Sequence, residues 1–431
     1  FFLNLKLKFL MNKNFYITTP IYYPSARPHM GHAYSSIVSD FFARLKKIQG
    51  YEVFFLTGTD EHGQKIQRAA ENKKKDPLKF CDEISATFKD LSKILNLSNN
   101  DFIRTTEVRH KKSVENLWKV LEKKKEIYLS KYSGWYSVSD EAFYSEDEIE
   151  DDGDLKISKL SGSKVEWVEE ESYFFKLSKW QEPLLSFYEK NPDFILPKTR
   201  KNEVVSFVRA GLKDLSISRK SFTWGIKVPS NNEHVIYVWL DALTNYISAL
   251  NYPNQNNDLY KKFWPADVHI IGKDILRFHA IYWPAFLLAA DIKPPKRVYG
   301  HGWILSGDEK MSKSKGNILD PLEIIEKYGL DPLRYYLLKE VSFGNDGNIS
   351  NEKLESCINS DLANNYGNLC QRVVSFCEKN IGLKVPTSEE FNEDDLNILN
   401  NYKNNFEDLN TNIDNQNINF YLNFIVDQLF K

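Results

Sequence analysis

Two histidines, His29 and His32, flank a Met-Gly pair in the segment ARPHMGHAYSSIVSDFFARL, which covers residues 26–45. The apolar residues that follow recur at helical spacing: Tyr34, Ile37, Val38, Phe41, Phe42 and Leu45. We therefore expect both histidines at or just before the first turn of a helix, where unpaired backbone N–H groups and the positive end of the helix dipole attract anions. The pattern predicts an anion site with two imidazoles beside it.

A second segment able to do chemistry is GDEKMSKSKGN, residues 307–317, which follows a predicted strand. It holds three lysines and two serines between glycines. Such a loop can fold over a polyphosphate, with Lys310 and Lys313 placed to stabilise the charge that develops on it. Taken singly, each of these two motifs is weak, because a lysine- and serine-rich loop is usually surface linker and short histidine spacings arise by chance.

A third candidate is Asp60 in the segment GTDEHG, residues 58–63. It follows the end of a predicted strand, where ligands bind in open α/β sheets, and its carboxylate can hold an ammonium group. A helix-capping aspartate is the alternative interpretation. His62 in the same segment fits an acid or base as well as a structural histidine, and the sequence leaves both open.

The overall composition is that of a globular protein. With 431 residues, 42% of them hydrophobic, the chain can bury a large core and is expected to form about two to four domains. The formal net charge is −2, from 57 basic and 59 acidic side chains. No global positive field points to a nucleic acid, so any RNA must bind to local patches.

The four cysteines form no Cys-x-x-Cys pair, which favours a reducing cytoplasm. Uncharged apolar runs such as IYWPAFLLAA, residues 281–290, are too short to span a bilayer, so we expect no membrane partner. The start FFLNLKLKFL lacks a small-residue cleavage site. We interpret residues 1–10 as a non-native or disordered tail, with Met11 as the natural start.

The order of predicted elements indicates an α/β fold. A strand at 15–20, a helix at 31–49 and a strand at 52–58 make a βαβ opening, which predicts a doubly wound parallel sheet. From about 117 to 228 short aromatic strands and an acidic stretch suggest an insertion. Strand and helix alternation returns at 234–243 and 267–290, and after about 320 the chain is mostly helical.

Taken together and in this order, the His-x-Gly-His and lysine motifs resemble the two signature motifs of class I aminoacyl-tRNA synthetases. The connecting segments resemble the methionyl-tRNA synthetase family from about residue 14 to the C-terminus. The matching blocks, in the order of that family, are TTPIYYPSARPHMGH, FLTGTDEHG, DLSISR, YVWLDALTNY, GKDILRFHAIYWP, KMSKSKGN and DPLRYYLL.

The resemblance implies a Rossmann-type doubly wound parallel sheet, split by a connective insertion domain and followed by an α-helical anticodon-binding bundle. It implies these parts: the tail 1–10, the first half of the catalytic domain 11–116, the insertion 117–228, the second half of the catalytic domain 229–319, a linker region 320–355, and a helical anticodon-binding domain 356–431 that we expect to be truncated.

The resemblance also implies roles for individual residues. The catalytic residues would be His29, His32, Lys310 and Lys313. ATP would bind to Gly31, Asp274, Gly302, Lys310, Met311, Ser312, Lys313 and Ser314. In similar enzymes an Asn/Arg pair reads the CAU anticodon, and Asn368 and Arg372, four residues apart on one helix face, match it.

The residues that would bind methionine are Ile21, Tyr23, Asp60, Trp239, Ala242, Tyr246, Phe278 and His279. The residue types suit the ligand. A methionine side chain is unbranched, apolar and polarizable, and its thioether gains from aromatic edges about 5 Å away. Asp60 would hold the ammonium group of the amino acid.

The insertion departs from many members of the family, which carry Cys-x-x-Cys knuckles that bind zinc there. The corresponding positions are Ser137 and Asp140, and no cysteine lies between Cys81 and Cys357. A structural Zn²⁺ needs four Cys or His ligands, so we expect no metal site. The expected cofactor is ATP with Mg²⁺, the ion riding on the nucleotide.

The implied function is that of a methionine–tRNA ligase in the cytoplasm, acting on L-methionine, ATP and tRNA(Met), initiator tRNA included, and expected to be a monomer as it stands. Three alternatives stay open: a class I synthetase for leucine, isoleucine, valine or cysteine, a nucleotidylyltransferase that uses no tRNA, and a catalytically inactive RNA-binding descendant. Arg219 in DLSISR fits a residue that reaches the active site and a surface salt bridge equally well.

Overall fold

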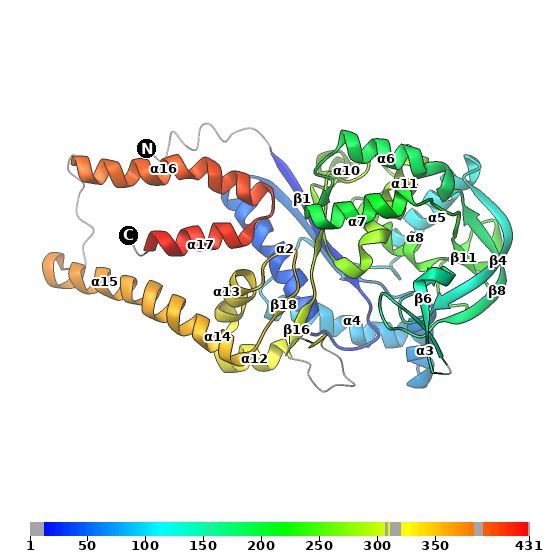
Figure 1. Ribbon diagram of the computed structural model, residues 1–431, viewed down its shortest axis with the longest axis horizontal. Helices are drawn as coiled ribbons and strands as arrows, with labels where there is room; N and C mark the ends of the chain where they lie inside the picture. The colour runs from blue at the N-terminus through cyan, green and yellow to red at the C-terminus, as the bar shows by residue number, and fades with distance from the viewer. Residues whose placement is uncertain (1–12, 154, 307–308, 311–319, 383–390, 430–431) are drawn as a thin grey trace. The chain divides into compact units, whose positions relative to one another are not determined.

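The computed structural model describes residues 13–153, 155–306, 309–310, 320–382 and 391–429 (Figure 1). By its internal packing the chain divides into two compact units. The first contains Phe1–Pro28 and Ser35–Gly300, and the second contains His29–Tyr34 and His301–Lys431. Each unit therefore brings together segments that are distant in the sequence.

A six-stranded sheet forms the centre of the first unit (Figure 1). Its strands, in spatial order, are β3 (Asp101–Arg104), β2 (Glu52–Thr59), β1 (Asn14–Tyr22), β14 (Val268–Gly272), β15 (Val298–His301) and β9 (Ile195–Leu196). β1 pairs in parallel with β2 on one side and β14 on the other, so that Ile17 lies opposite Phe55 and Val268. The pairs β2–β3 and β15–β9 are parallel too. The predicted doubly wound parallel sheet is confirmed.

The opening βαβ unit has the form predicted from the sequence. β1 and β2 are nearly continuous runs of buried residues, as expected of parallel strands covered on both faces. Between them, α2 (Met30–Ile48) ends two residues before Gly50, whose φ of 86° turns the chain toward β2.

Helices cover the sheet and join its strands. Those of the first unit are α3 (Gln64–Asn72), α4 (Pro77–Ile94), α5 (Val108–Lys123), α6 (Gln181–Lys190), α7 (Lys198–Arg209), α8 (Val238–Leu243), α9 (Asn245–Ser248), α10 (Asp258–Phe263) and α11 (Trp283–Ala289). The start of α4 illustrates local control by sequence: Asp76 accepts a hydrogen bond from the Lys79 N–H, and Pro77 occupies the first position of the helix.

The segment 117–228, predicted as the insertion, contains a second sheet. Its strands, in spatial order, are β10 (Leu215–Ser216), β8 (Glu166–Phe175), β4 (Ile127–Ser137) and β5 (Ala142–Tyr144). Two smaller sheets consist of β11 (Ser218–Arg219), β13 (Asn231–Ile236) and β12 (Lys227–Val228), and of β6 (Ile149–Asp152) with β7 (Leu155–Ser158). β9, from the same segment, joins the central sheet instead. The limits of the insertion domain stay a prediction.

Aromatic packing joins this second sheet to the central one. Phe175 of β8 meets Phe286 of α11 edge to face, with ring centres 4.9 Å apart. The hydroxyl of Tyr188 in α6 donates to the carbonyl of Ala280 at 2.7 Å. Phe175, Tyr188 and Phe286 are all buried in one continuous apolar core. The second sheet is therefore held against the parallel sheet by burial of apolar area.

The turn between β4 and β5 follows Ser137 and contains Asp140, the two positions that correspond to zinc-binding cysteines in many proteins that this sequence resembles. The Asp140 carboxylate accepts hydrogen bonds from the Tyr144 hydroxyl at 2.8 Å, the Ser163 hydroxyl at 2.8 Å, and the Ser161 hydroxyl. Within the described ranges, no group of three or more metal-ligating side chains comes together. The absence of zinc stays a prediction, but this hydrogen-bonded carboxylate closes the turn.

The second unit combines a small sheet with a series of helices. The strands are β17 (Glu309–Lys310), β16 (Ile304–Ser306) and β18 (Gly347–Asn348). The helices are α12 (Pro321–Tyr328), α13 (Leu330–Glu340), α14 (Asn351–Cys357), the π-helical η6 (Ile358–Gly367), α15 (Asn368–Ile381), α16 (Glu393–Asp414) and α17 (Ile418–Leu429). Asn419 ties α17 to the end of α13, because its side chain donates to the Lys339 carbonyl at 2.7 Å and accepts from the Phe343 N–H at 2.9 Å.

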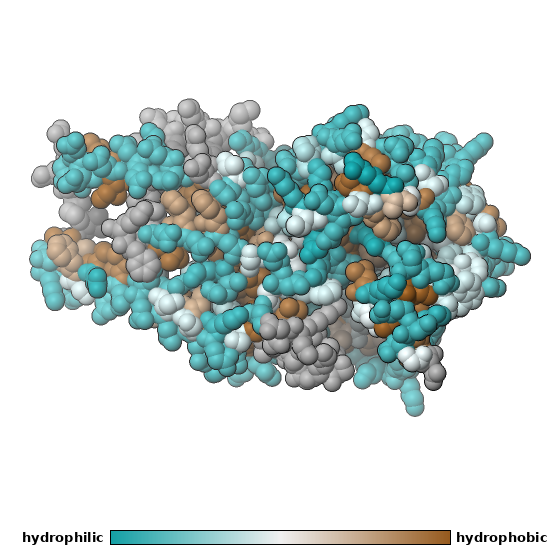
Figure 2. Space-filling model, viewed as in Figure 1, coloured by the Kyte–Doolittle hydropathy of each residue, from teal (hydrophilic) through white to brown (hydrophobic). Residues whose placement is uncertain are grey.

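Apolar side chains are exposed along α15 (Figure 2). Leu369, Val373, Val374 and Phe376 are all exposed. Among the helices that the structure describes, none combines the length and the apolar character needed to cross a membrane.

Candidate active site

Three predicted site residues follow the carboxyl ends of neighbouring strands. Tyr23 is the first residue after β1, Asp60 is the first after β2, and Asp274 is the second after β14. Because β2, β1 and β14 are adjacent and parallel, these residues lie at the same edge of the sheet. In an open α/β sheet this edge is where ligands bind.

Asp60 is buried, with 2% of its surface exposed. Its Oδ1 atom and the buried Tyr23 hydroxyl make no hydrogen bond of normal geometry within the part of the chain that the structure describes, although the Tyr23 hydroxyl is close enough to lower the pKa of Asp60 against the larger effects of burial and neighbouring charges. Burial and the negative charges of Asp241 and Glu141 raise the pKa of Asp60 well above its usual value. A cation that entered beside Asp60 would find an acceptor and would favour the ionised carboxylate.

The neighbours of Asp60 in the GTDEHG segment are committed to other contacts. Glu61 forms a two-pronged ion pair with Arg104, whose Nε and Nη2 atoms lie 2.6 and 3.0 Å from its two carboxylate oxygens. The Gly63 N–H donates to the Trp224 carbonyl at 3.2 Å. This loop is therefore held at Glu61 and at Gly63, on both sides of His62.

His62 makes a buried contact in this fold, as expected under the structural interpretation, and its role stays a prediction. Its Nδ1 atom lies 2.7 Å from Oδ2 of Asp241, and Nε2 of His110 lies 2.6 Å from Oδ1. All three side chains are buried. Burial opposes ionisation of Asp241, but His62 and His110 outweigh it and lower its pKa to about 2. The three residues join the Asp60 loop, α5 and α8.

Aromatic residues predicted to line a methionine pocket do come together. The rings of Trp239 and Phe278 stack with centres 3.7 Å apart and an angle of 4° between planes. Trp239 also meets His279 edge to face at 6.2 Å. Phe278 and His279 belong to the π-helical turn η4 (Phe278–Tyr282), an irregularity common at functional sites. Ile21 and Tyr23 pack against the same apolar cluster, and Ala242 is buried beside Trp239 in α8.

His279 is held as a neutral imidazole. Its Nδ1 atom lies 3.0 Å from the Ile275 carbonyl, which can only accept, so Nδ1 carries the proton. Nε2 then accepts from the Tyr246 hydroxyl at 2.7 Å. Burial lowers the pKa of His279 to about 4. Burial also lowers the pKa of His269, whose ring stacks on Tyr246 at 4.0 Å. Both histidines thus add no charge to this pocket at neutral pH.

The two histidines of the HMGH segment lie at the start of α2, as predicted. Their ring centres are 3.8 Å apart. The Gly31 N–H donates to Nδ1 of His29 at 3.1 Å, and the His29 N–H donates to Nδ1 of His32 at 3.0 Å. Since both Nδ1 atoms accept, the proton of each neutral ring is on Nε2. Each imidazole therefore has an Nε2–H donor suited to a phosphate oxygen.

The second unit brings this helix start together with residues 301–303 of the GHGW segment. The ring of Tyr34 meets that of His301 edge to face, with centres 5.2 Å apart. Gly302 approaches the backbone of Asn345 so closely that a Cβ atom would lie 2.2 Å from its carbonyl carbon. Only glycine fits at this predicted ATP contact.

The lysine motif is described only in part. Lys310 is in β17, opposite Leu305 of β16, which anchors the first residue of the motif to the second unit. Met311, Ser312, Lys313 and Ser314 lie outside the described residues. The structure thus places the methionine-site candidates in one unit, and the HMGH segment and residues 301–303 in the other. The meeting of both groups over ATP stays a prediction.

Comparison with known proteins agrees with this arrangement of motifs. The profile of the family described as tRNA synthetases class I (M) matches residues 15–154 and 153–374. Methionine–tRNA ligase of Rickettsia bellii is 57% identical over 376 residues, which cover 87% of this chain and 73% of the relative. The chain belongs to the methionyl-tRNA synthetase family.

Other relatives of the synthetase include the methionine–tRNA ligase of Rickettsia conorii, 56% identical over 376 residues and likewise covering 87% of this chain and 73% of the relative. Among solved structures, Mycobacterium tuberculosis methionyl-tRNA synthetase in complex with methionyl-adenylate is similar with a TM-score of 0.94 and 46% identity. That match covers 97% of this chain and 82% of the other.

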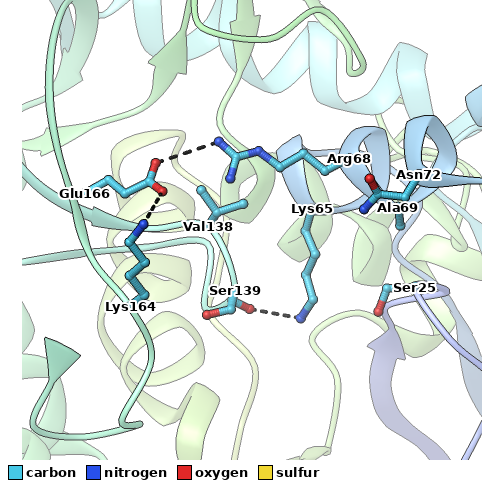
Figure 3. Close-up of a pocket in the computed structure, with 9 residues that line it drawn as sticks. All are labelled: Ser25, Lys65, Arg68, Ala69, Asn72, Val138, Ser139, Lys164 and Glu166. Atoms are coloured by element: carbon cyan, nitrogen blue, oxygen red, sulfur yellow. Dashed lines mark hydrogen bonds and ion pairs between the residues drawn. The ribbon is translucent and has the colours of Figure 1, made fainter. Parts of the chain in front are cut away.

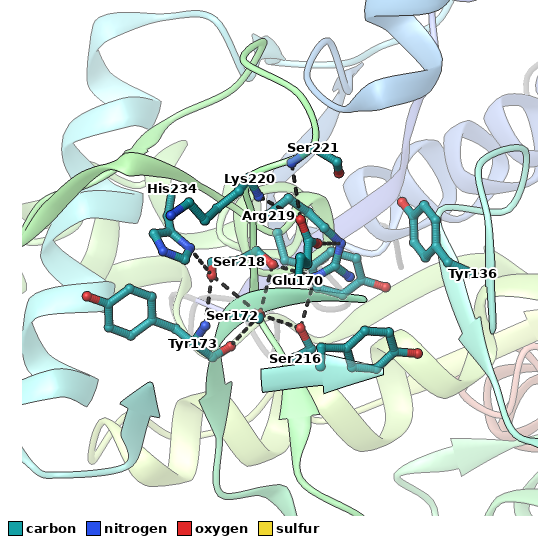
Figure 4. Close-up of polar contacts among 12 residues, drawn as sticks. Tyr136, Glu170, Ser172, Tyr173, Ser216, Ser218, Arg219, Lys220, Ser221 and His234 are labelled. Carbon is teal, nitrogen blue, oxygen red and sulfur yellow. Dashed lines mark hydrogen bonds and ion pairs between the residues drawn. The ribbon is translucent and has the colours of Figure 1, made fainter. Parts of the chain in front are cut away.

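Arg219 of the synthetase is buried, with 1% of its surface exposed, so it is no surface salt bridge (Figure 4). Its guanidinium lies 4.0 Å from the ring centre of Phe143, and Nη1 donates to the Ser216 hydroxyl at 2.9 Å. Its Nε atom is 3.6 Å from Glu170. Nε and Nη2 have no hydrogen-bond partner within the described ranges. Whether Arg219 contacts substrate stays a prediction.

The predicted anticodon pair of the synthetase is exposed on α15. Asn368 and Arg372 are both exposed. The Asn368 amide donates to the Asn364 carbonyl one turn earlier, at 2.8 Å. The residues are therefore on an accessible helix face, while contact with RNA is untested.

The chain order gave no indication of the Asp241 contacts, because His110 and Asp241 are 131 residues apart. We expect Asp241→Asn to lower the free energy of unfolding by about 3 kcal/mol, since it leaves a buried histidine N–H without its charged acceptor. Because the pKa of Asp241 is lowered from 3.8 to about 2 by folding, the carboxylate stabilises the fold above about pH 4 and loses this effect as the pH falls toward 2.

Urea unfolding of the unsubstituted protein and of Asp241→Asn at several pH values measures this difference in the free energy of unfolding. The matched control is Asp90→Asn, which removes an exposed carboxylate beside Lys93 and is expected to change stability by less than about 0.5 kcal/mol. Equal effects of the two substitutions would contradict a structural role for the buried contacts of Asp241.

Proposed function

We propose that this synthetase activates L-methionine with ATP to methionyl-adenylate and transfers the methionyl group to tRNA(Met), initiator tRNA included. Membership of the family and the likeness to a structure that holds methionyl-adenylate support this. The observation in the site that carries the proposal is the buried Oδ1 atom of Asp60, which makes no hydrogen bond of normal geometry among the described residues and follows β2 at the ligand-binding edge of the sheet.

Methionine would bind with its ammonium group at Asp60 and its side chain among the aromatic residues. The lining would consist of Ile21, Tyr23, Trp239, Ala242, Tyr246, Phe278 and His279. The aromatic residues would offer ring edges to the thioether, and the neutral state of His279 keeps charge away from the uncharged side chain of methionine. Charged amino-acid side chains would lose their hydration there without gaining a partner.

ATP would bind between the other predicted residues, with Mg²⁺ accompanying its phosphates. The Nε2–H groups of His29 and His32 would donate to phosphate oxygens, beside Gly31 at the helix start. Asp274 would bind the ribose, and Gly302 would let the backbone approach adenine. The lysine loop would close over the phosphates with these residues: Lys310, Met311, Ser312, Lys313 and Ser314.

The reaction needs little covalent chemistry from the protein. In the first step a carboxylate oxygen of methionine attacks the α-phosphorus of ATP, and pyrophosphate leaves with the electron pair of the broken P–O bond. In the second, a hydroxyl of the 3′-terminal adenosine attacks the methionyl carbonyl carbon, loses its proton and releases AMP. The side chains would act by in-line positioning and by stabilising charge, with His29, His32, Lys310 and Lys313 nearest the phosphates.

Recognition of tRNA would use Asn368 and Arg372, which present an amide and a guanidinium for hydrogen bonding and stacking on unpaired anticodon bases. We also propose the domain limits given by the sequence, a zinc-free insertion closed by Asp140, and a monomer working in the cytoplasm. The cysteine pattern supports the last point.

Pyrophosphate exchange dependent on the amino acid tests the proposed function. We expect methionine to support exchange at a kcat/KM at least about 100-fold above that of leucine, isoleucine, valine or cysteine, since methionine alone places a thioether at the ring edges. If another of these amino acids supported exchange better than methionine, the enzyme would be specific for that amino acid instead. No exchange with any amino acid would favour an inactive RNA-binding protein.

Asp60→Asn is expected to raise the KM for methionine about 10- to 100-fold, because it replaces a charged hydrogen bond to the ammonium group by a neutral one. In the unsubstituted protein the affinity for methionine should fall as the pH decreases through the raised pKa of Asp60, where the carboxylate becomes protonated. The variant should show no such decrease. Methionine titrations across pH measure both effects, and an unchanged KM would remove Asp60 from the site.

His32→Ala and Lys313→Ala are each expected to lower kcat/KM for adenylate formation. The expected decrease corresponds to a loss of about 2 to 4 kcal/mol of transition-state stabilisation, as for the loss of one preorganised donor. Thermal unfolding with and without an adenylate analogue separates this from loss of folding, because ligand binding stabilises a folded site. Undiminished adenylate formation in both variants would contradict the proposed roles.

A further inference from the structure

Helix α3 begins where the Asp60 loop ends, and its own sequence supplies no side-chain cap. The N-cap residue is Gly63, with φ of 104°. The N–H groups of the first helical turn have no partner inside a helix, so they need acceptors from elsewhere. How the first turn of α3 is capped therefore bears on the position of the loop that carries Asp60.

Glu141 supplies an acceptor from a distant part of the chain. Its Oε1 atom accepts a hydrogen bond from the Lys65 N–H at 2.8 Å, and the side chain is fully buried. A Cβ atom at Gly63 would lie 2.8 Å from the same Oε1 atom. Glycine is therefore required at position 63 both for the positive φ and for the close approach of this carboxylate.

The side chain of Glu141 is itself held in place. The Tyr136 hydroxyl donates to its other carboxylate oxygen, and the Tyr237 hydroxyl donates to its main-chain carbonyl at 2.7 Å. Glu141 adopts a left-handed conformation with φ of 49°, directly after the hydrogen-bonded Asp140. The turn between β4 and β5 thus aims one buried carboxylate at the start of α3.

A second contact joins the same two segments (Figure 3). Lys65 Nζ donates to the Ser139 carbonyl at 2.9 Å, beside a cavity of about 350 Å³ between α3 and this turn. The same ammonium group lies 5.2 Å from the ring centre of Tyr23, at the edge of the predicted methionine pocket. Both the main chain and the side chain of Lys65 are therefore bound to the turn at residues 139–141.

We propose that Glu141 is a positioning residue for methionine binding: by capping α3 it holds the loop from Asp60 to Gly63, and with it the Asp60 carboxylate, where the ammonium group is received. The inference rests on the proposed role of Asp60. The β4–β5 turn then contributes to the amino-acid site through one side chain, that of Glu141, which is long enough to accept a hydrogen bond from the Lys65 N–H.

The length of the Glu141 side chain and its negative charge can be tested separately for their effect on methionine binding. Burial raises the pKa of the Glu141 carboxyl, against the hydrogen bonds from Tyr136 and Lys65. Its negative charge also contributes to the raised pKa of Asp60. If the charge drew in the ammonium group, any carboxylate in this place would serve. If the cap positions the loop, a neutral acceptor of full length serves and a shorter carboxylate does not.

The test compares Glu141→Gln with Glu141→Asp in methionine-dependent pyrophosphate exchange. Glutamine keeps the acceptor at full length, whereas aspartate keeps the charge but is one methylene shorter. We expect Glu141→Asp to raise the KM for methionine at least about fivefold, as for loss of one helix cap, and Glu141→Gln to change it less than about threefold. kcat and the KM for ATP should stay near the unsubstituted values in both.

Two further variants complete the experiment. Asn392→Ala removes the side-chain cap of α16, a helix of the second unit, whereas the loop from Asp60 to Gly63 belongs to the first, and should leave the KM for methionine unchanged even if the melting temperature falls. Tyr136→Phe removes one hydroxyl that orients the carboxylate and should raise this KM about two- to fivefold, so the inference can be tested even if Glu141→Asp does not fold.

An unchanged KM in both Glu141→Asp and Tyr136→Phe would overturn the inference, as would a Glu141→Gln variant worse than Glu141→Asp. So would an equal effect of Asn392→Ala. These outcomes are distinct from failure of the proposed function, which would appear as absence of methionine-dependent exchange in the unsubstituted protein.

Discussion

A buried carboxyl group costs free energy unless a cation or hydrogen-bond donors reach it, and Asp60 is buried. One of its oxygens has no partner among the described residues, and its pKa is raised by burial and by two further acids. The cost is tolerated because the loop around it is held by other contacts. An ammonium group beside Asp60 would offset this cost.

The contacts that hold this loop come from across the first unit. Glu61 is bound by Arg104, and His62 by Asp241. Gly63 is bound through its N–H by Trp224, and the helix after it by Glu141. Buried polar networks of this kind are worthwhile only when nearly every member is satisfied. In this loop the exception is the oxygen that faces the predicted ligand.

The two histidines beside the aromatic rings, His279 and His269, are kept neutral by the same desolvation. His279 donates to a main-chain carbonyl and accepts from Tyr246, which uses both ring nitrogens in the neutral form. The stacked rings of Trp239 and Phe278 add apolar surface beside it. Such a site distinguishes ligands by shape and polarizability, and hydration makes the binding of a charged side chain unfavourable.

The sequence by itself determined the parallel sheet, because hydrophobic periodicity and the βαβ order are local, and it determined the candidate residues carried by short motifs, such as His29, His32 and Asp60. Tertiary structure alone decided what surrounds them. Asp241 and His110 are 131 residues apart, and Glu141 and Lys65 are 76 apart. No local pattern encodes such pairs, since they form only when burial of distant apolar faces brings their elements together.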